Sequence, residues 1–214
     1  MIFRDRIEAG ERLAEALSAW RGRRPLVVVI PRGAVPMGKL VADRLAGDFD
    51  IVLTRKLHAP WDPEFAVGAV DEAGWTYVSD DAAPSGASPE YLRQQAAAEL
   101  ATMRQRRALY TPGRAPLDAA GRVVIVVDDG LATGATMIAA LHALRAKRPQ
   151  WLVCAAPVAS RQAVANVRPY ADEVVCVHVP GDFHAVGQYY GEFPQVSDAQ
   201  VVALLRALPA STTP

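Results

Sequence analysis

The sequence predicts an α/β protein in which a mostly parallel sheet is flanked by helices. Short runs rich in Val and Ile lack apolar–polar alternation, which is typical of strands covered on both faces. Segments with helical periodicity separate these runs, as right-handed strand–helix–strand crossovers require. The length of 214 residues fits one domain with an elaboration, because a typical domain has ~150 residues.

The expected elements alternate along most of the chain. The first helix should begin at a capping box, since Asp5 is followed three residues later by Glu8. Strands are expected at residues 26–30, 50–54, 123–127, 151–157 and 173–178, and helices at 5–20, 35–45, 136–146 and 160–168.

One stretch interrupts the alternation. Residues 66–70 and 75–78 flank a turn, Asp71-Glu-Ala-Gly74, and predict a β-hairpin. Ser88 followed by Pro89 then predicts the start of a long helix to about Tyr110, and residues 111–120 form a linker rich in Pro. We therefore expect a single domain over residues 1–214, with a flap hairpin and helical insertion at 66–120. The helix ends in Arg104, Arg106 and Arg107, which form either a solvated face or an anion-collecting rim.

Composition limits the classes of function. Lys plus Arg and Asp plus Glu both number 23, and this balance argues against a general binder of nucleic acid or membrane surfaces. The two cysteines are too few for a disulfide scaffold or a structural zinc site and favour a reducing, cytoplasmic location. The first residues lack the apolar run of a signal peptide, and no run approaches the ~20 residues that span a bilayer.

The segment from Val123 to Thr136 carries the strongest functional signal. An apolar strand is followed by Asp128-Asp129 and then by the small residues Gly130-Leu-Ala-Thr-Gly-Ala-Thr136, which lead into a helix. Ligands of α/β sheets bind off the carboxyl ends of strands. A small-residue loop at a helix N-terminus attracts phosphate, and Gly134 lets the backbone approach closely. Thr133 and Thr136 add hydroxyl donors.

The two carboxylates need a different partner, because they repel phosphate but accept hydrogen bonds from vicinal hydroxyls. A ribose 5-phosphate carries both groups side by side. Neighbouring residues of a strand point to opposite faces, so the strand must end at Asp128 if both acids are to reach one ligand. The alternative is a solvated strand end in which Asp129 is a turn residue.

Residues 123–137 resemble the diphosphoribosyl-binding motif of type I phosphoribosyltransferases, most closely their adenine and orotate branches. From Phe3-Arg-Asp-Arg6 to about Leu205, the chain also resembles a bacterial family of phosphoribosyltransferases whose acceptor base is not settled. The resemblance implies the type I fold with a small C-terminal hood at residues 180–196. It implies transfer of phosphoribose from 5-phosphoribosyl 1-diphosphate (PRPP) to a nitrogenous base, or the reverse, with Mg²⁺ and release of pyrophosphate. Nucleotide metabolism, small-molecule substrates and a homodimer are expected.

The same resemblance assigns roles to individual residues. Asp128 and Asp129 are the catalytic acids that hold the ribose hydroxyls, directly or through the metal. The 5-phosphate site is formed by Leu131, Ala132, Thr133, Gly134, Ala135 and Thr136. The pyrophosphate site is formed by Pro31, Arg32, Gly33, Arg55 and Lys56. The base site in the hood is formed by Phe183, Val186 and Tyr189.

The proton-transfer residue is less well defined. Hypoxanthine–guanine enzymes carry an acid at the loop position that Ala132 occupies here, whereas adenine enzymes use a glutamate on a nearby hairpin. Glu72 is therefore the first candidate and Glu64 the second, and guanine specificity is disfavoured.

Two other functions compete with the transferase. One is a non-catalytic PRPP-binding regulator on the same fold, although Arg32, Arg55 and Lys56 favour turnover. The other is a P-loop nucleotide hydrolase, because residues 33–39 fit G-x-x-x-x-G-K. Leu40 stands where that motif needs Ser or Thr, and Pro36 removes a backbone donor from the loop.

Overall fold

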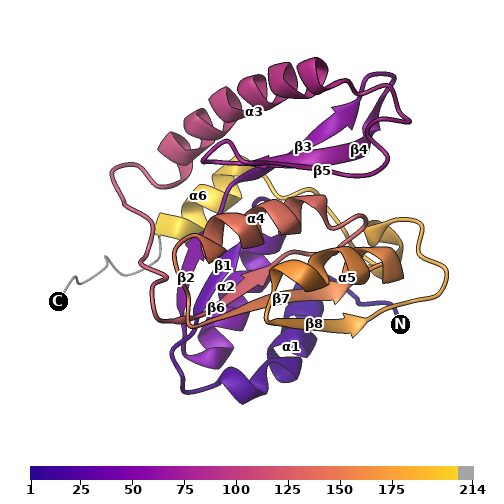
Figure 1. Ribbon diagram of the computed structural model, residues 1–214. Helices are drawn as coiled ribbons and strands as arrows, with labels where there is room; N and C mark the ends of the chain where they lie inside the picture. The colour runs from indigo at the N-terminus through magenta and orange to yellow at the C-terminus, as the bar shows by residue number, and fades with distance from the viewer. Residues whose placement is uncertain (207–214) are drawn as a thin grey trace.

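The computed structural model describes residues 1–206, apart from the side chain of Glu64. It contains a five-stranded parallel sheet and a three-stranded antiparallel sheet (Figure 1). The parallel sheet has the order β2-β1-β6-β7-β8 and the antiparallel sheet the order β3-β4-β5. The strands are β1 (Leu26–Val29), β2 (Asp48–Ile51), β3 (Thr54–Ala59), β4 (Asp62–Asp71), β5 (Thr76–Val78), β6 (Val123–Val127), β7 (Trp151–Val158) and β8 (Glu173–His178).

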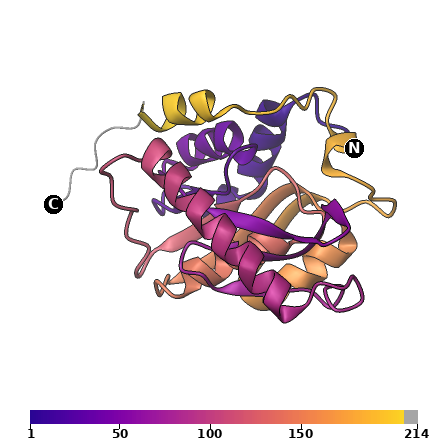
Figure 2. The same cartoon turned by 90° about the horizontal axis from the view of Figure 1, so that it is seen from above.

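Helices cover both faces of the parallel sheet, as expected for this α/β class. α1 (Arg6–Ala16) and α2 (Ala34–Leu45) pack on one face, and α4 (Ala135–Arg145) and α5 (Arg161–Val167) on the other. The antiparallel sheet lies on α4, and α3 (Pro89–Tyr110) crosses its outer side (Figure 2). α6 (Asp198–Arg206), which the sequence did not predict, contacts α2 and α3. Single 3₁₀ turns lie at Ser18–Trp20, Arg168–Tyr170 and Val186–Tyr189.

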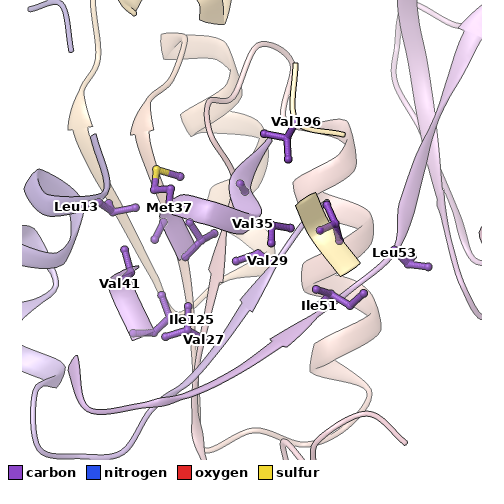
Figure 3. Close-up of a cluster of buried hydrophobic side chains, with 14 of the residues drawn as sticks. Leu13, Val27, Val29, Val35, Met37, Val41, Ile51, Leu53, Ile125 and Val196 are labelled. Atoms are coloured by element: carbon purple, nitrogen blue, oxygen red, sulfur yellow. The ribbon is translucent and has the colours of Figure 1, made fainter. Parts of the chain in front are cut away.

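Alternate strand residues are buried on opposite faces, which explains the missing alternation. Val27, Val29 and Ile125 pack with Leu13 and Met37 of α1 and α2 (Figure 3). Their neighbours Val28, Val124 and Val126 pack instead with residues of α4 and α5. Full burial of each such side chain contributes about 1.5–3 kcal/mol.

The predicted strand at residues 50–54 is wrong in its extent, because two strands of different sheets share this run. β2 ends at Ile51 and β3 begins at Thr54. Val52 N–H still donates to Val29 O at 3.0 Å, whereas Leu53 N–H donates to the Glu72 carboxylate at 3.1 Å. Every residue from Ile51 to Thr54 is buried, so hydrophobicity alone cannot reveal the break. Consequently Arg55 and Lys56 belong to the antiparallel sheet.

The predicted starts of α1 and α3 are confirmed. Asp5 accepts hydrogen bonds from the N–H groups of Ile7 and Glu8 at 2.8 Å. The Glu8 carboxylate accepts from Arg4 N–H at 2.7 Å, one residue before the cap, so the capping box is only half formed. Ser88 caps α3 with Pro89 in its first turn, as predicted. No helix within residues 1–206 is long and apolar enough to cross a membrane.

Candidate functional site

The connectivity of the parallel sheet creates a topological switch point between β1 and β6, which we call the crevice. From β1 the chain passes through α2 to β2 on one side, and from β6 it passes through α4 to β7 on the other. α2 and α4 begin at the carboxyl ends of these strands, on opposite faces of the sheet. Such a switch point is where α/β folds bind ligands. Residues 30–33 and 128–136 lie here, as the sequence predicted.

The acid pair follows β6, which ends at Val127, one residue before the expected end at Asp128, so that both acids lie beyond the strand. Asp129 N–H donates to Asp128 Oδ1 at 2.9 Å. Burial raises the pKa of Asp128 well above its usual range, and the adjacent Asp129 carboxylate raises it further. Burial also raises the pKa of Asp129, while Arg6 opposes this shift. The site therefore holds two poorly hydrated acids side by side.

Arg6 is a site residue that sequence reasoning missed. Its Nε and Nη2 each lie 2.9 Å from Asp129 Oδ2. Its Nη1 donates to Pro194 O at 2.6 Å, and its guanidinium lies 3.7 Å from the centre of the Phe193 ring. Tyr190 Oη donates to Asp129 O at 2.6 Å. The start of α1 and the hood segment thus meet on Asp129. The only sequence signal was that Phe3-Arg-Asp-Arg6 opens the region of resemblance.

The loop after β1 contacts the acid pair directly. A Cβ at position 33 would lie 1.9 Å from Asp129 Oδ2, so only glycine fits there. Arg32 Nη1 lies 3.6 Å from Asp198 Oδ1 at the start of α6, and Tyr110 Oη also donates to Asp198. The peptide bond between Pro31 and Arg32 is cis. The structure therefore brings Gly33 and the acid pair together, and α6 contacts Arg32.

The loop at residues 131–134 is held from its outer side. Leu131 is buried and exchanges backbone hydrogen bonds with β7 and α5: its N–H donates to Val158 O and its O accepts from Ser160 N–H, both at 2.9 Å. Ser160 Oγ donates to Ala132 O at 2.7 Å, and Asn166 Nδ2 donates to Thr133 O at 3.0 Å. Ser160 and Asn166 were not predicted. Their local signal is limited to the helix cap that Ser160 forms.

Holding the carbonyls outward leaves N–H groups for a ligand. Among residues 1–206, no backbone carbonyl pairs with the N–H of Ala132, Thr133 or Gly134. Gly134 has φ +84° and precedes α4, whose first turn contains Ala135 and Thr136. A side chain at Gly134 would be strained by this φ and would lie 2.9 Å from Val167 Cγ1. The geometry suits an anion at the N-terminus of α4.

The remaining predicted residues divide between two surroundings. Lys56 is exposed, and its charge lowers the pKa of both Asp128 and Asp129, which places it by the acid pair. Arg55 points to the other face of β3, where Nε lies 2.6 Å from Glu99 Oε2 of α3.

Glu72, the first candidate for proton transfer, accepts hydrogen bonds from Leu53 N–H and from Arg107 Nε, the latter at 2.9 Å. Arg107 thus pairs with the hairpin turn. The side chain of Glu64 lies outside the described part of the chain.

The hood residues play different parts. Val186 covers Gly130, where an added Cβ would lie 2.4 Å from Val186 Cγ1. Tyr189 is buried, and Phe183 stacks on it with ring centres 5.5 Å apart and planes at 22°. Val186 is therefore the predicted base-site residue that contacts the β6–α4 loop.

The P-loop pattern does not form a nucleotide-binding loop. Gly38 and Lys39 lie inside α2, and a Cβ at Gly38 would lie 2.0 Å from Val29 Cγ1. Gly38 therefore serves close packing of α2 on β1. Lys39 Nζ pairs with Asp43 at 2.6 Å on the same helix. Neither residue faces the crevice loops as a P-loop requires.

Comparisons with known proteins show the family of the chain. The family model described as "Phosphoribosyl transferase domain" matches residues 4–192. Two Mycobacterium tuberculosis proteins, one named "Putative phosphoribosyl transferase Rv0571c", are 40% identical over 209 residues, which is 95% of this chain and 46% of theirs. The chain thus spans about half the length of these curated relatives.

Solved structures show the same architecture. TT1426 from Thermus thermophilus is 45% identical, with a TM-score of 0.80 over 96% of this chain and 98% of that one. AQ2163 from Aquifex aeolicus is 11% identical, with a TM-score of 0.51 over 93% and 83%, and supports the fold alone. On the family match and these relatives, the chain belongs to the phosphoribosyl transferase domain family.

Proposed function

We propose that this protein transfers 5-phosphoribose from PRPP to a nitrogenous base, or catalyses the reverse reaction, with release of pyrophosphate. One observation carries the proposal. The acid pair and the N–H-bearing loop of β6–α4 adjoin the loop after β1 at a single switch point. A ligand that bears a diol, a 5-phosphate and a second anionic group complements these three elements.

The phosphate and the diol bind to different parts of one loop. The N–H groups of Ala132, Thr133 and Gly134 receive the 5-phosphate, aided by the dipole of α4. Asp128 accepts hydrogen bonds from the ribose hydroxyls. Asp129 uses Oδ2 for Arg6, which leaves Oδ1 for the ligand. The ribose is thereby fixed, and its anomeric carbon lies toward the loop after β1.

Catalysis requires stabilisation of the departing pyrophosphate. The bond from the anomeric carbon to the pyrophosphate oxygen loosens first, so the ribose gains positive charge while the leaving group gains negative charge. A nitrogen of the base then bonds to the same carbon from the opposite face. Arg32 and Lys56 meet that developing charge, which lowers the barrier more than it aids binding of the ground state. The hood, through Val186 over Gly130, excludes water from the same carbon.

Asp128 and Asp129 are suitable ligands for Mg²⁺, which prefers carboxylate oxygens. Among residues 1–206, no three His, Cys, Asp or Glu side chains cluster to hold a metal by themselves. Mg²⁺ does not require such a cluster, because it keeps several waters and binds substrate phosphates. When bound, the metal supplies charge neutralisation at the pyrophosphate.

The function is tested by pyrophosphate release from PRPP with Mg²⁺ and a panel of purine and pyrimidine bases. Asp128→Asn with Asp129→Asn should weaken PRPP binding at least ~100-fold, since each charge-assisted hydrogen bond contributes about 1.5–3 kcal/mol. The exposed pair Asp80→Asn with Asp81→Asn is the matched control and should bind PRPP normally. Unchanged affinity in the first variant contradicts the diol assignment. PRPP binding without turnover of any base points to a non-catalytic regulator.

A further inference from the structure

The end of the sheet opposite the crevice concentrates positive charge. β1, β6 and β7 are adjacent in the sheet. Arg24 lies two residues before β1, Arg122 one residue before β6, and Arg148 three residues before β7. Two of the segments share a pattern, Arg21-Gly-Arg-Arg-Pro25 and Arg145-Ala-Lys-Arg-Pro149. Because the strands are parallel, their amino-terminal ends lie at the same end of the sheet, and these segments meet there.

Most of this charge is not neutralised. Arg122 pairs with Asp48 at 2.5 Å and Arg145 with Asp172 at 2.9 Å. Within residues 1–206, the exposed side chains of Arg23, Arg24, Lys147 and Arg148 form no ion pair. The chain as a whole has a net charge of zero, so this end of the sheet is more positively charged than the rest of the molecule.

Three of these arginines line one open cavity of about 600 Å³. Arg23, Arg24 and Arg122 contribute to its wall, with Asp48 as the single carboxylate. Arg122 Nη2 donates to Arg24 O at 3.0 Å, so the Asp48 pair and this bond hold its guanidinium. The Arg23 guanidinium lies 5.4 Å from the Trp20 ring centre. Held side chains lose less conformational entropy when they bind a ligand.

The backbone provides an independent observation. Arg24 has φ 46° and Arg148 has φ 55°, in the left-handed region that favours glycine. Among the described residues, the only other such non-glycine is Ala46, which ends α2. A residue other than glycine is strained in this region. Of the two strained arginines, Arg24 lines the cavity.

We propose that this cavity is a second anion site that binds the di- or triphosphate group of a soluble ligand. Planar guanidinium forks match phosphate oxygens in pairs. Three such groups around one cavity suit a compact, highly charged anion better than an extended polyanion. The five residues of β6, at ~3.3 Å each, place this site about 16 Å from the crevice. The site is therefore separate from the proposed PRPP site.

The decisive measurement is calorimetric titration with inorganic triphosphate. Arg23→Ala with Arg24→Gly removes two guanidinium groups, and glycine suits the φ of position 24, so the fold should be retained. We expect affinity to fall at least tenfold in this variant. Arg23→Lys with Arg24→Lys keeps the charge and should lose less. Arg93→Ala with Arg206→Ala, two exposed arginines elsewhere, is the control for net charge and should bind like the wild type.

A further variant separates the two sites. Arg32→Ala with Lys56→Ala weakens anion binding in the crevice. Triphosphate that still binds to this variant therefore occupies the cavity at the opposite end of the parallel sheet. Similar affinities for triphosphate and ATP support recognition of the phosphate group alone, and tighter ATP binding identifies a nucleotide. The proposal is overturned if Arg23→Ala with Arg24→Gly binds triphosphate like the wild type, if the control loses equal affinity, or if only RNA oligonucleotides bind.

Discussion

Asp128 combines functional placement with a cost in stability. Its carboxyl group is half-buried and poorly hydrated beside a second acid, so its pKa is raised in the folded state. A raised carboxyl pKa contributes stability below the ordinary pKa, and this contribution is lost as the pH rises through the raised value. The stability of the wild-type protein should therefore decline as the pH rises through the raised pKa of Asp128. Active sites commonly accept such a cost in exchange for function.

Asp128→Asn should accordingly raise the melting temperature at pH 8 while it weakens PRPP binding. Each kcal/mol of relieved desolvation corresponds to roughly 2–4 °C in a chain of this size. The gain should shrink as the pH falls toward the ordinary carboxyl range, because the raised pKa favours the protonated form of the wild-type carboxyl. Thermal unfolding at several pH values measures this, with the exposed Asp81→Asn as control. Equal melting temperatures at pH 8 would exclude a strained Asp128 carboxylate.

Arg6 makes the opposite contribution, because it neutralises Asp129 in a partly buried pair. Arg6→Ala leaves that acid without its cation and removes the contact with Phe193. We expect a loss of about 3 kcal/mol in unfolding free energy, since breaking a buried pair costs about 3–5 kcal/mol. Arg12→Ala, on the exposed face of the same helix, should cost under ~0.5 kcal/mol.

A double-mutant cycle then identifies the partner. The effects of Arg6→Ala and Asp129→Asn should be strongly non-additive, with a coupling of at least ~1 kcal/mol in urea unfolding. Additive effects would mean that Arg6 stabilises the protein mainly through Pro194 and Phe193.

At the scale of elements, the hairpin turn is joined to α3 and to the start of β3. Glu72 binds both Arg107 and the N–H of Leu53. These contacts indicate a structural role for Glu72, whereas the sequence analysis made Glu72 the first candidate for proton transfer. Glu72→Gln and Arg107→Gln should therefore have similar effects: a loss of about 1–2 kcal/mol in stability and little change in kcat. A fall in kcat of ~100-fold or more for Glu72→Gln alone, with an altered pH profile, would restore the catalytic role.

The sequence predicts an element or contact well only where the residues that define it are close together in the chain. β6, its acid pair and the loop into α4 were predictable because strand, turn and helix start follow one another within residues 123–136. The Arg6–Asp129 pair joins residues 123 positions apart, and no local pattern encodes such a contact. The break between β2 and β3 was invisible because burial continues through Val52 and Leu53.

α4 links the two sheets of the whole molecule. One side of it packs on the parallel sheet through Ile138 and Leu141, and Ala135 and Ala139 pack against Ala69 of β4. The small alanines let the antiparallel sheet approach closely, and Trp75 stacks on His142 of α4 with ring centres 3.7 Å apart. Neither sheet can lose α4 without exposing apolar surface. The two sheets should consequently form one cooperative unit.

Single-tryptophan variants test this cooperativity. A variant that keeps Trp75 and replaces the other three tryptophans with Phe reports on the contact between the residue before β5 and α4. One that keeps Trp151, beside Trp20 at the amino end of the parallel sheet, reports on the opposite end of the molecule. Fluorescence in urea should give one midpoint for each variant, coincident with its own far-ultraviolet circular dichroism, as two-state unfolding requires. A Trp75 transition well below the circular dichroism midpoint would mean that the antiparallel sheet unfolds independently of the parallel sheet.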